Sequence, residues 1–291
     1  MSIDIIHPTM ADLIDPAAQI EKIGDGFKFA EGPVWDAGKN CLYFSDIPAN
    51  ILYRWIEKDG FVVHREPSQN TNGLTLNGLG QLLSCEHSGR RISIEREGQA
   101  QTLVSRYQGK RLNSPNDLIV CRNGDVVFTD PPYGLPRKDG VAIGQEIPFS
   151  GVYRLPAGTD EPVLLVDDFD RPNGLALTAD EKTLYVDDTA RKHIRAFDVA
   201  ADGSLSRDRV FAELIGEGKG APDGMKLDRH GNVFCTGAGG VWVFSPGGDL
   251  LGKIRTESST ANIGWGGADM QTLYMTASTE VLRLRCKTGA K

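Results

Sequence analysis

One short pattern recurs six times along the chain, and a tandem repeat of this kind limits the possible folds more than any local feature. Each copy contains an apolar run that ends in a polar or small residue; the six runs occupy residues 42–46, 82–86, 126–130, 184–188, 233–237 and 273–277. An oxygen-bearing residue and a short alternating segment begin ten or eleven positions upstream of each run. Turn residues such as Asn123-Gly124-Asp125 separate the two segments, so each unit is predicted to open with a β-hairpin.

Third and fourth alternating segments follow most hairpins, for example at 151–155 and 163–166. Units of about 40 to 57 residues with four antiparallel strands are typical of propeller blades. The sequence therefore predicts an all-β protein, a six-bladed β-propeller with four-stranded antiparallel blades around a central metal-binding channel. A pair of β-sandwich domains is the alternative, but no change in composition divides the chain.

The last repeat ends after three strands, so residues 19–23 are predicted to supply its fourth strand and close the ring. This arrangement makes residues 1–18 an N-terminal extension and residues 19–291 a single propeller domain. The 34 glycines and 15 prolines are spread along the whole chain rather than gathered in a linker, which suits many short strands joined by tight turns.

A formal net charge of -7, without a contiguous basic patch, argues against a nucleic-acid or anionic-membrane surface. No run of about 18 apolar residues is present to span a membrane. We expect a small-molecule partner and a monomer or small homo-oligomer. The five cysteines are odd in number and widely spaced, so buried free thiols in a cytoplasmic protein are predicted. A signal peptide removed from the chain would instead imply a periplasmic location.

The residues that open the repeats all carry side-chain oxygen: Glu31, Asn72, Asn116, Asn173, Asp223 and Asn262. The first strand of every propeller blade lines the central channel, so these side chains are predicted to converge there. Carboxylates and amide carbonyls form a hard oxygen cage that suits Ca²⁺, Mg²⁺ or Mn²⁺ better than zinc. The alternative is that each Asn-Gly or Asp-Gly pair simply serves a turn.

Acidic residues close four of the apolar runs: Asp46, Glu86, Asp130 and Asp188. Strand two of a blade ends beside the start of strand one, so these carboxylates are predicted to lie near one mouth of the channel. There they would orient the metal ligands, accept protons, or cap backbone N–H groups in tight loops. We expect Asp46 and Asp130 to support the ligands.

Two further residues near these acids are candidate substrate contacts. His87 directly follows Glu86, and either faces the substrate or is a hydrogen-bonded structural residue. Tyr133 precedes an insertion at 134–150, which forms either a lid or a variable surface loop. Other chemistries lack support, because no Gly-x-Ser-x-Gly elbow is present and the Gly-rich run at 216–220 lacks phosphate-loop spacing.

Several motifs together resemble the gluconolactonase, senescence-marker-protein and luciferin-regenerating-enzyme family, from about residue 20 to the C-terminus. They comprise Glu31-Gly-Pro, Phe44-Ser-Asp-Ile-Pro48, Cys85-Glu-His87, Ser114-Pro-Asn-Asp117, Thr129-Asp-Pro-Pro-Tyr133, Pro172-Asn-Gly174 and Pro222-Asp-Gly224. The senescence-marker branch carries an arginine where this chain has Ser114, so that branch's sugar contacts do not transfer. The match is closer to bacterial gluconolactonase-like members.

The resemblance implies metal ligands at Glu31, Asn173 and Asp223, with Asn116 as a fourth ligand or a substrate contact. It also implies that Asp223 is the general base. One divalent cation is expected as cofactor, with calcium as the first choice and magnesium, manganese or zinc as alternatives. Asn72 and Asn262 are not standard ligands of the family. We expect Asn72, with Asn116, His87 and Tyr133, to contact substrate.

The implied activity is metal-dependent hydrolysis of a small lactone, with an aldonolactone such as gluconolactone as the first candidate. In this reaction the cation polarises the carbonyl and stabilises the oxyanion, while Asp223 activates a water. A cation-bound carboxylate is a weak base, so Asp130 or His87 is an alternative proton acceptor. The rival functions are a phosphotriesterase of the diisopropyl-fluorophosphate-hydrolysing type and a non-catalytic calcium-binding or regulatory propeller.

Overall fold

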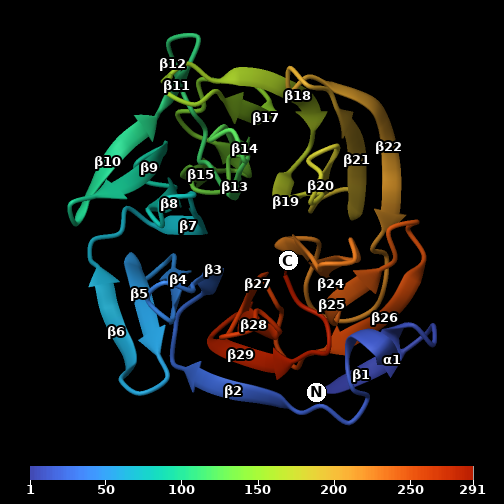
Figure 1. Ribbon diagram of the computed structural model, residues 1–291. Coiled ribbons are helices and arrows are strands. Elements are labelled where there is room, and N and C mark those ends of the chain that lie inside the picture. The colour runs from blue at the N-terminus through green and yellow to red at the C-terminus, as the bar shows by residue number, and fades with distance from the viewer. Residues whose placement is uncertain (291) are drawn as a thin grey trace.

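A computed structural model describes residues 1–290 and arranges them as six antiparallel sheets around a central axis (Figure 1). Each sheet is a blade of four strands, and one blade carries a fifth strand at its outer edge. The predicted all-β, six-bladed propeller is therefore confirmed. Each of the six repeats supplies the first three strands of one blade.

The blades are numbered 1 to 6 in chain order from the repeat that begins near residue 30. Blades 1 to 3 comprise β3 (Ala30–Asp36), β4 (Cys41–Asp46), β5 (Ile51–Ile56), β6 (Gly60–Arg65); β7 (Thr71–Leu76), β8 (Leu82–Glu86), β9 (Arg91–Arg96), β10 (Gln99–Val104); and β13 (Leu118–Val120), β14 (Val126–Asp130), β17 (Ser150–Leu155), β18 (Val163–Phe169). Blades 4 to 6 comprise β19 (Pro172–Leu177), β20 (Thr183–Asp188), β21 (His193–Val199), β22 (Leu205–Glu213); β23 (Met225–Leu227), β24 (Val233–Gly237), β25 (Gly240–Phe244), β26 (Leu250–Arg255); and β27 (Asn262–Gly266), β28 (Thr272–Ala277), β29 (Glu280–Arg285) with β2 (Ile20–Asp25).

The ring closes in blade 6, where β2 from the N-terminal part of the chain pairs with β29 from the C-terminal part. The register runs antiparallel from Ile20 opposite Leu284 to Asp25 opposite Glu280. Figure 1 shows these two segments side by side at the bottom of the ring. The predicted closing strand is confirmed, and it extends two residues beyond the predicted end.

The N-terminal extension packs against the propeller. β1 (Ser2–Ile5) pairs with β26 as the fifth strand of blade 5, and α1 (Met10–Leu13) follows. Met10 and Ile14 are fully buried in a cluster that also contains apolar residues of blades 5 and 6. The extension therefore covers apolar surface that the two blades would otherwise expose.

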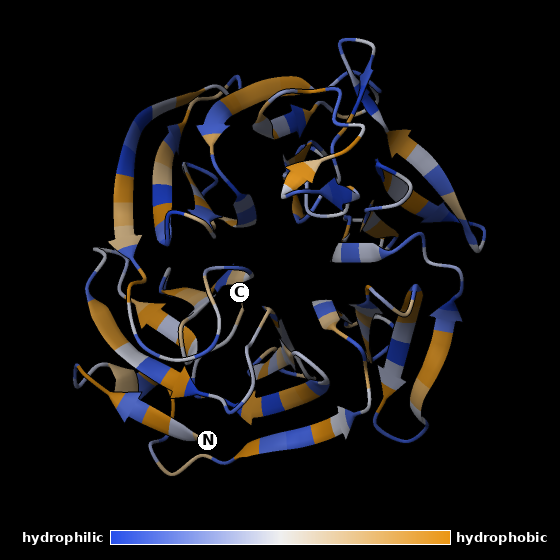
Figure 2. Cartoon of the chain, turned by 180° about the vertical axis from the view of Figure 1, so that it is seen from behind, coloured by the Kyte–Doolittle hydropathy of each residue, from blue (hydrophilic) through white to orange (hydrophobic). Residues whose placement is uncertain are grey.

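The positions of the strands in the blades explain their sequence patterns. The second strands β4, β8, β14 and β24 are buried at every residue, because neighbouring blades cover both faces of each sheet. This is the origin of the continuous apolar runs in the sequence. The outer strand β22 is exposed at most positions, and polar and apolar residues are interspersed along the outer strands (Figure 2).

Hydroxyl groups on second strands link one blade to the next. The Ser45 Oγ donates to the Asn72 carbonyl oxygen at 2.7 Å, and the Thr129 Oγ1 donates to the Asn173 carbonyl oxygen at 2.8 Å. Each bond joins strand two of a blade to the first strand of its successor. The first strands are thereby held at fixed positions around the axis.

The insertion at 134–150 contains a small hairpin, β15 (Arg137–Lys138) with β16 (Val141–Ala142). A second small hairpin, β11 (Arg106–Tyr107) with β12 (Lys110–Arg111), precedes blade 3. The two segments are connected, because the Arg111 N–H donates to Glu146 at 2.7 Å. Arg90 also donates to the Gly144 carbonyl oxygen at 3.0 Å. The insertion is thus tied to blade 2 beside the channel mouth.

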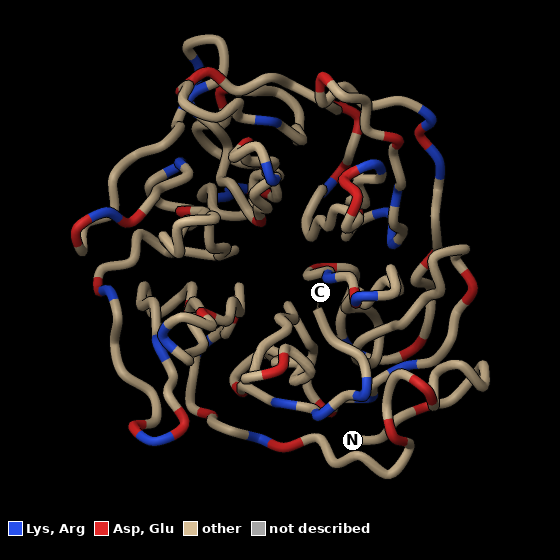
Figure 3. The backbone as a smooth tube through the Cα atoms, viewed as in Figure 1, with Lys and Arg blue, Asp and Glu red and all other residues tan. Residues whose placement is uncertain are grey.

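The distribution of charged residues and the state of the cysteines agree with the expectations from the sequence. Lysine and arginine alternate with acidic residues around the ring (Figure 3). All five cysteines are unpaired, and all but the half-buried Cys121 are buried. Within residues 1–290, no helix has the length and apolar character needed to cross a membrane.

We predict that Ile14→Ala destabilises the protein by about 2–5 kcal/mol, because it leaves a cavity beneath the N-terminal extension. Ile6→Ala removes the same atoms from a side chain that is 55% exposed, so it should change stability by at most about 0.5 kcal/mol. Urea unfolding followed by fluorescence measures both. Equal effects would show that the extension does not contribute to the folded core.

Candidate functional site

Ten residues line a cavity of about 260 Å³ at one mouth of the central channel. Seven of them are the predicted metal ligands and substrate contacts: Glu31, Asn72, His87, Asn116, Tyr133, Asn173 and Asp223. They come from five of the six blades, so residues up to about 190 positions apart in sequence meet in one place. The structure therefore brings the whole predicted set together.

The start of each first strand aims these side chains at the axis. Glu31 lies in β3, Asn72 in β7 and Asn173 in β19, and in all three strands the pairing register shifts beside that residue. Such a bulge bends the strand and redirects a side chain that would otherwise point to one face of the sheet. Asn116 and Asp223 lie two residues before the shorter first strands β13 and β23.

The glycine that follows several of these residues is required by close backbone contact rather than by a turn. A Cβ atom added at Gly174 would lie 2.0 Å from the Asp223 carbonyl oxygen of the next blade. At Gly32 it would lie 2.2 Å from the Asn72 carbonyl oxygen, and Gly32 also has a φ of +57°. The Asn-Gly, Asp-Gly and Glu-Gly pairs thus allow adjacent first strands to approach each other. The simple turn interpretation is wrong for Asn72 and Asn173, which lie within strands.

Glu31 and Asp223 form a pair of acids, of which Glu31 is buried. Burial raises the pKa of both carboxyls, and the negative charge of Glu31 raises that of Asp223 further. Asp223 is only partly enclosed because it opens onto the cavity. Among the described residues, none of the ten that line the cavity is a lysine or arginine. Two acids in a site without a protein cation would be stabilised in their charged form by a bound cation.

Asn262 lies behind Glu31 and does not line the cavity. Its Nδ2 donates to Glu31 Oε2 at 2.9 Å, and its own Oδ1 accepts the Ile263 N–H at 2.8 Å. Asn262 thus holds Glu31 in place from behind the cavity wall. Asn262 therefore meets Glu31 from another blade, as its place in the repeat predicts, but lies outside the lining of the cavity.

Two other amides present a free oxygen. The Asn173 Nδ2 donates to the Thr189 hydroxyl at 3.0 Å, and the Asn72 Nδ2 lies 3.3 Å from His87 Nε2. The Oδ1 atoms of both asparagines are buried without a partner among residues 1–290. A buried carbonyl without a donor is costly unless a ligand satisfies it. Glu31, Asp223 and the amide oxygens thus fit a hard cation.

The site differs from a zinc or thiolate centre. Within the described part of the chain, no cluster of three or more His, Cys, Asp or Glu residues is positioned to hold a metal. This agrees with the predicted set, in which only two of four ligands are carboxylates and the other two are amides. Such a mixed set suits calcium or magnesium rather than the softer metals.

His87 is a neutral hydrogen-bond acceptor at the cavity wall. Its side chain is 7% exposed, and burial lowers its pKa to about 4. Since Asn72 contacts Nε2 through an amide N–H, the ring proton resides on Nδ1. Tyr133 lies on another side of the cavity, where burial raises the pKa of its phenol to about 12. The phenol is therefore a proton donor at neutral pH.

Asp46 and Asp130 do not line the cavity but secure the segments that lead to it. The Asp46 carboxylate accepts the N–H groups of Lys28 and Phe29 at 2.9 and 3.1 Å. Asp130 accepts the Asn113 N–H at 2.7 Å. Each acid thus caps the chain two or three residues before a predicted ligand. Capping is here the means by which either acid would orient that ligand.

Three lining residues were missed in the sequence: Phe29, Ile47 and Thr189. Ile47 and Thr189 directly follow the acids that end strand two in blades 1 and 4, just as His87 does in blade 2. Phe29 lies two residues before Glu31. The repeat alignment contains this signal, because the residue after the strand-two acid lines the cavity in three of the four blades whose second strand ends in an acid.

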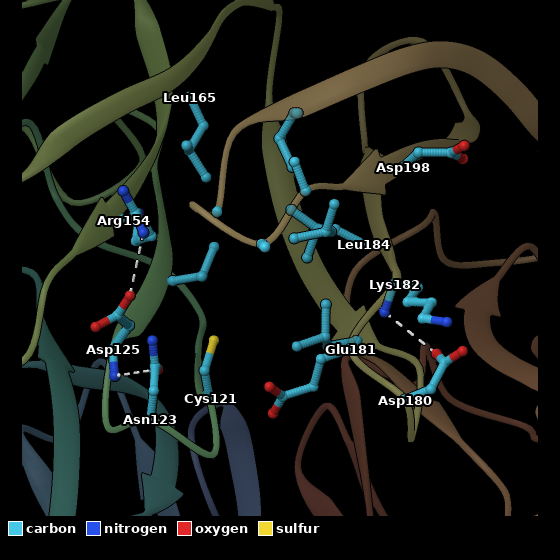
Figure 4. Close-up of a pocket in the computed structure, with 17 residues that line it drawn as sticks. Cys121, Asn123, Asp125, Arg154, Leu165, Asp180, Glu181, Lys182, Leu184 and Asp198 are labelled. Atoms are coloured by element: carbon cyan, nitrogen blue, oxygen red, sulfur yellow. Dashed lines mark hydrogen bonds and ion pairs between the residues drawn. The ribbon is translucent and has the colours of Figure 1, made fainter.

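A larger cavity of about 490 Å³ lies between blades 3 and 4, at the opposite ends of the strands (Figure 4). Apolar side chains such as Leu165 and Leu184 form much of its lining. Two of its charged groups form an ion pair, Arg154 with Asp125 at 3.3 Å. The smaller channel cavity, with its unsatisfied oxygens and paired acids, is the better candidate for chemistry.

Comparisons with a family model, with relatives in sequence and with solved structures all identify the same family. Residues 29–279 match the family model described as the SMP-30/Gluconolactonase/LRE-like region. The chain is 36% identical to a gluconolactonase of Zymomonas mobilis, over 97% of this chain and 85% of the relative. It is 28% identical to a pentonolactonase of Haloferax volcanii, over 86% and 82%. A solved gluconolactonase from Xanthomonas campestris superposes with a TM-score of 0.90 at 36% identity, over 98% of this chain and 95% of that one.

We predict that the protein loses stability as the pH falls from 6.5 toward 4, because only the unfolded chain protonates His87 in this range. At pH 5 the wild type should have lost about 2 kcal/mol more unfolding free energy than His87→Gln. The ordinary histidine pKa lies about 1.5 units above this pH, and each unit corresponds to about 1.36 kcal/mol. Urea unfolding at pH 7.5 and 5.0 measures it. His230→Gln, in an exposed turn, is the control. An identical pH dependence in all three proteins would contradict a buried neutral His87.

Proposed function

Because this chain belongs to the SMP-30/gluconolactonase/LRE-like family, we propose that it is a metal-dependent lactonase that opens a small sugar lactone to its hydroxy acid. The observation that carries the proposal is that buried Glu31 and partly enclosed Asp223 share one cavity with unsatisfied amide oxygens. A protein without a ligand for this site would bury these groups at a net cost.

Glu31, Asn173 and Asp223 are the proposed ligands of one divalent cation, and Asn116 is the fourth ligand or a substrate contact. Bound there, the ion would act as a Lewis acid that polarises the lactone carbonyl. Calcium is the proposed ion, because the ligands are all oxygens and half of the set is uncharged. Asn262 keeps Glu31 oriented for this role through its 2.9 Å hydrogen bond.

The cavity suits a small polar ring. About 260 Å³ accommodates a five- or six-membered lactone, and amide, imidazole and phenol groups surround it. Phe29 and Ile47 add apolar walls that can pack against the face of a sugar ring. The named activities of the relatives, a gluconolactonase and a pentonolactonase, support an aldonolactone as the substrate class.

Asp223 is the proposed general base that removes a proton from the attacking water. The Asp223 carboxylate lines the cavity, so it is placed to accept a proton from a water that enters there with the lactone. His87 is the alternative, because it lines the same cavity as a neutral acceptor. Asp130 is a weaker alternative, since it lies outside the lining and is engaged with the Asn113 N–H.

We predict that Asp223→Asn lowers kcat/KM for gluconolactone by at least about 100-fold, because it removes both a charged ligand and the base. Glu31→Gln should lower calcium affinity without removing the base. A pH-indicator assay, corrected for spontaneous ring opening, and calcium titration calorimetry measure the two effects. Chelation with EDTA should abolish turnover while the circular dichroism spectrum is retained.

Three results would contradict this proposal in different ways. Full activity of Asp223→Asn would remove its assignment as base and ligand. Unfolding upon chelation, without any prior lactonase activity, would indicate a structural ion in a non-catalytic propeller. Turnover of phosphotriesters but not of sugar or aromatic lactones would indicate the diisopropyl-fluorophosphatase type of reaction.

We also predict that Tyr133→Phe raises KM for the lactone about tenfold with little change in kcat, because the phenol would bind substrate and transition state alike. Steady-state kinetics at saturating calcium measure it. Tyr107→Phe is the matched control, since Tyr107 packs against Tyr153 outside the cavity. A fall in kcat with unchanged KM would instead place the phenol in the chemical step.

A further inference from the structure

We propose that Thr189 is the positioning residue that fixes which end of the Asn173 amide faces the cavity, and hence whether the site can bind its cation. This inference rests on the proposed metal site and assigns a role to a residue outside the ligand set. Thr189 lies in the loop after β20, at the cavity edge and beside Asn173.

The hydrogen-bond directions at Thr189 leave one arrangement. Its hydroxyl carries a single proton, and this proton is donated to the Pro222 carbonyl oxygen at 2.8 Å. The hydroxyl can therefore only accept from the Asn173 side chain, which lies 3.0 Å away. An amide accepts through oxygen and donates through nitrogen. The Asn173 Nδ2 must then face Thr189, and Oδ1 must be the atom left for the cavity.

The opposite rotamer would be unfavourable for two reasons. Turning the amide by 180° would place Oδ1 against a hydroxyl oxygen whose proton is already in use. It would also present an N–H group, instead of a carbonyl oxygen, to the cavity that Glu31 and Asp223 also line. An N–H donor cannot ligate a cation. One hydroxyl thus determines whether Asn173, one of the four predicted ligands, presents an oxygen or an N–H group.

The same hydroxyl also contacts the segment that carries Asp223. Pro222, whose carbonyl accepts the Thr189 proton, is the residue directly before Asp223. Thr189 therefore connects the loop of blade 4 to the start of blade 5, and places two predicted ligands in a fixed relation. A turn residue with only a local role would hydrogen-bond within its own loop, whereas both partners of Thr189 lie in other segments.

The test is calcium titration calorimetry on EDTA-treated protein that carries Thr189→Val, which keeps the shape and removes the hydroxyl. We expect calcium to bind about 10- to 100-fold more weakly, as when other groups that orient metal ligands are removed. Thr189→Ser restores the hydroxyl and should restore affinity. If the valine variant does not fold, Thr189→Ala removes the same hydroxyl without adding a methyl group beside Pro222.

Thr288→Val is the matched control, because it removes a buried hydroxyl that donates to Asp228 at 2.8 Å, away from the cavity lining. Its calcium affinity should equal that of the wild type.

Combining Thr189→Val with Asn173→Asp isolates the orientation effect. Both terminal atoms of an aspartate are oxygens, so the valine substitution should weaken calcium binding less in that background.

The outcomes separate this inference from the proposed function. Wild-type protein that binds neither calcium nor magnesium or manganese overturns the metal site and this inference together. If the wild type binds calcium and Thr189→Val binds it with equal affinity, only the Thr189 assignment is overturned. Equal weakening in Thr189→Val and Thr189→Ser would also overturn it, because the hydroxyl would then not be responsible. Recovery of lactone turnover by Thr189→Val at saturating calcium supports it.

Discussion

Closure of the ring by β2 and β29 is the interaction on which the rest of this structure depends. A sheet that ended after β29 would expose an unpaired edge. No chain segment would then connect blade 6 directly to blade 1. With β2 in blade 6, the chain continues directly into blade 1. Asn262 then reaches Glu31 across 231 positions of sequence. The predicted metal site exists only in the closed ring.

The ring also concentrates polar groups where a globular protein would normally place its core. Apolar clusters fill the spaces between blades, as where Val127 and Val152 of blade 3 meet Leu175 and Phe197 of blade 4. The first strands instead bring acids and amides together at the axis. The strands approach so closely that glycine is needed at positions such as 174. Axial chemistry thus comes from the residues that open the first strands, whereas interblade packing comes from apolar residues farther along the sheets. This division lets the axis retain groups that weaken packing.

The sequence was sufficient for the fold and for the lining residues that repeat in register. Six copies of one pattern predicted the blades, the closing strand and the convergence of Glu31, Asn173 and Asp223. It was not sufficient for contacts between repeats. Nothing in a single copy reveals that Asn262 turns its amide toward Glu31, or that Thr189 shares its hydroxyl between Asn173 and Pro222. Such pairings depend on the distance between neighbouring blades, which a one-dimensional alignment does not contain.

The source of each lining residue suggests how one scaffold supports several lactones. The proposed ligands lie at the starts of first strands, where bulges, glycine contacts and interblade hydroxyls fix them. The lining residues Ile47, His87 and Tyr133, which are proposed to face the substrate, lie in loops after strand two. Loops accept substitution and insertion more readily than packed strands do. The rigid axis is therefore suited to determine the reaction, while the loops at the mouth determine which lactone ring fits above it.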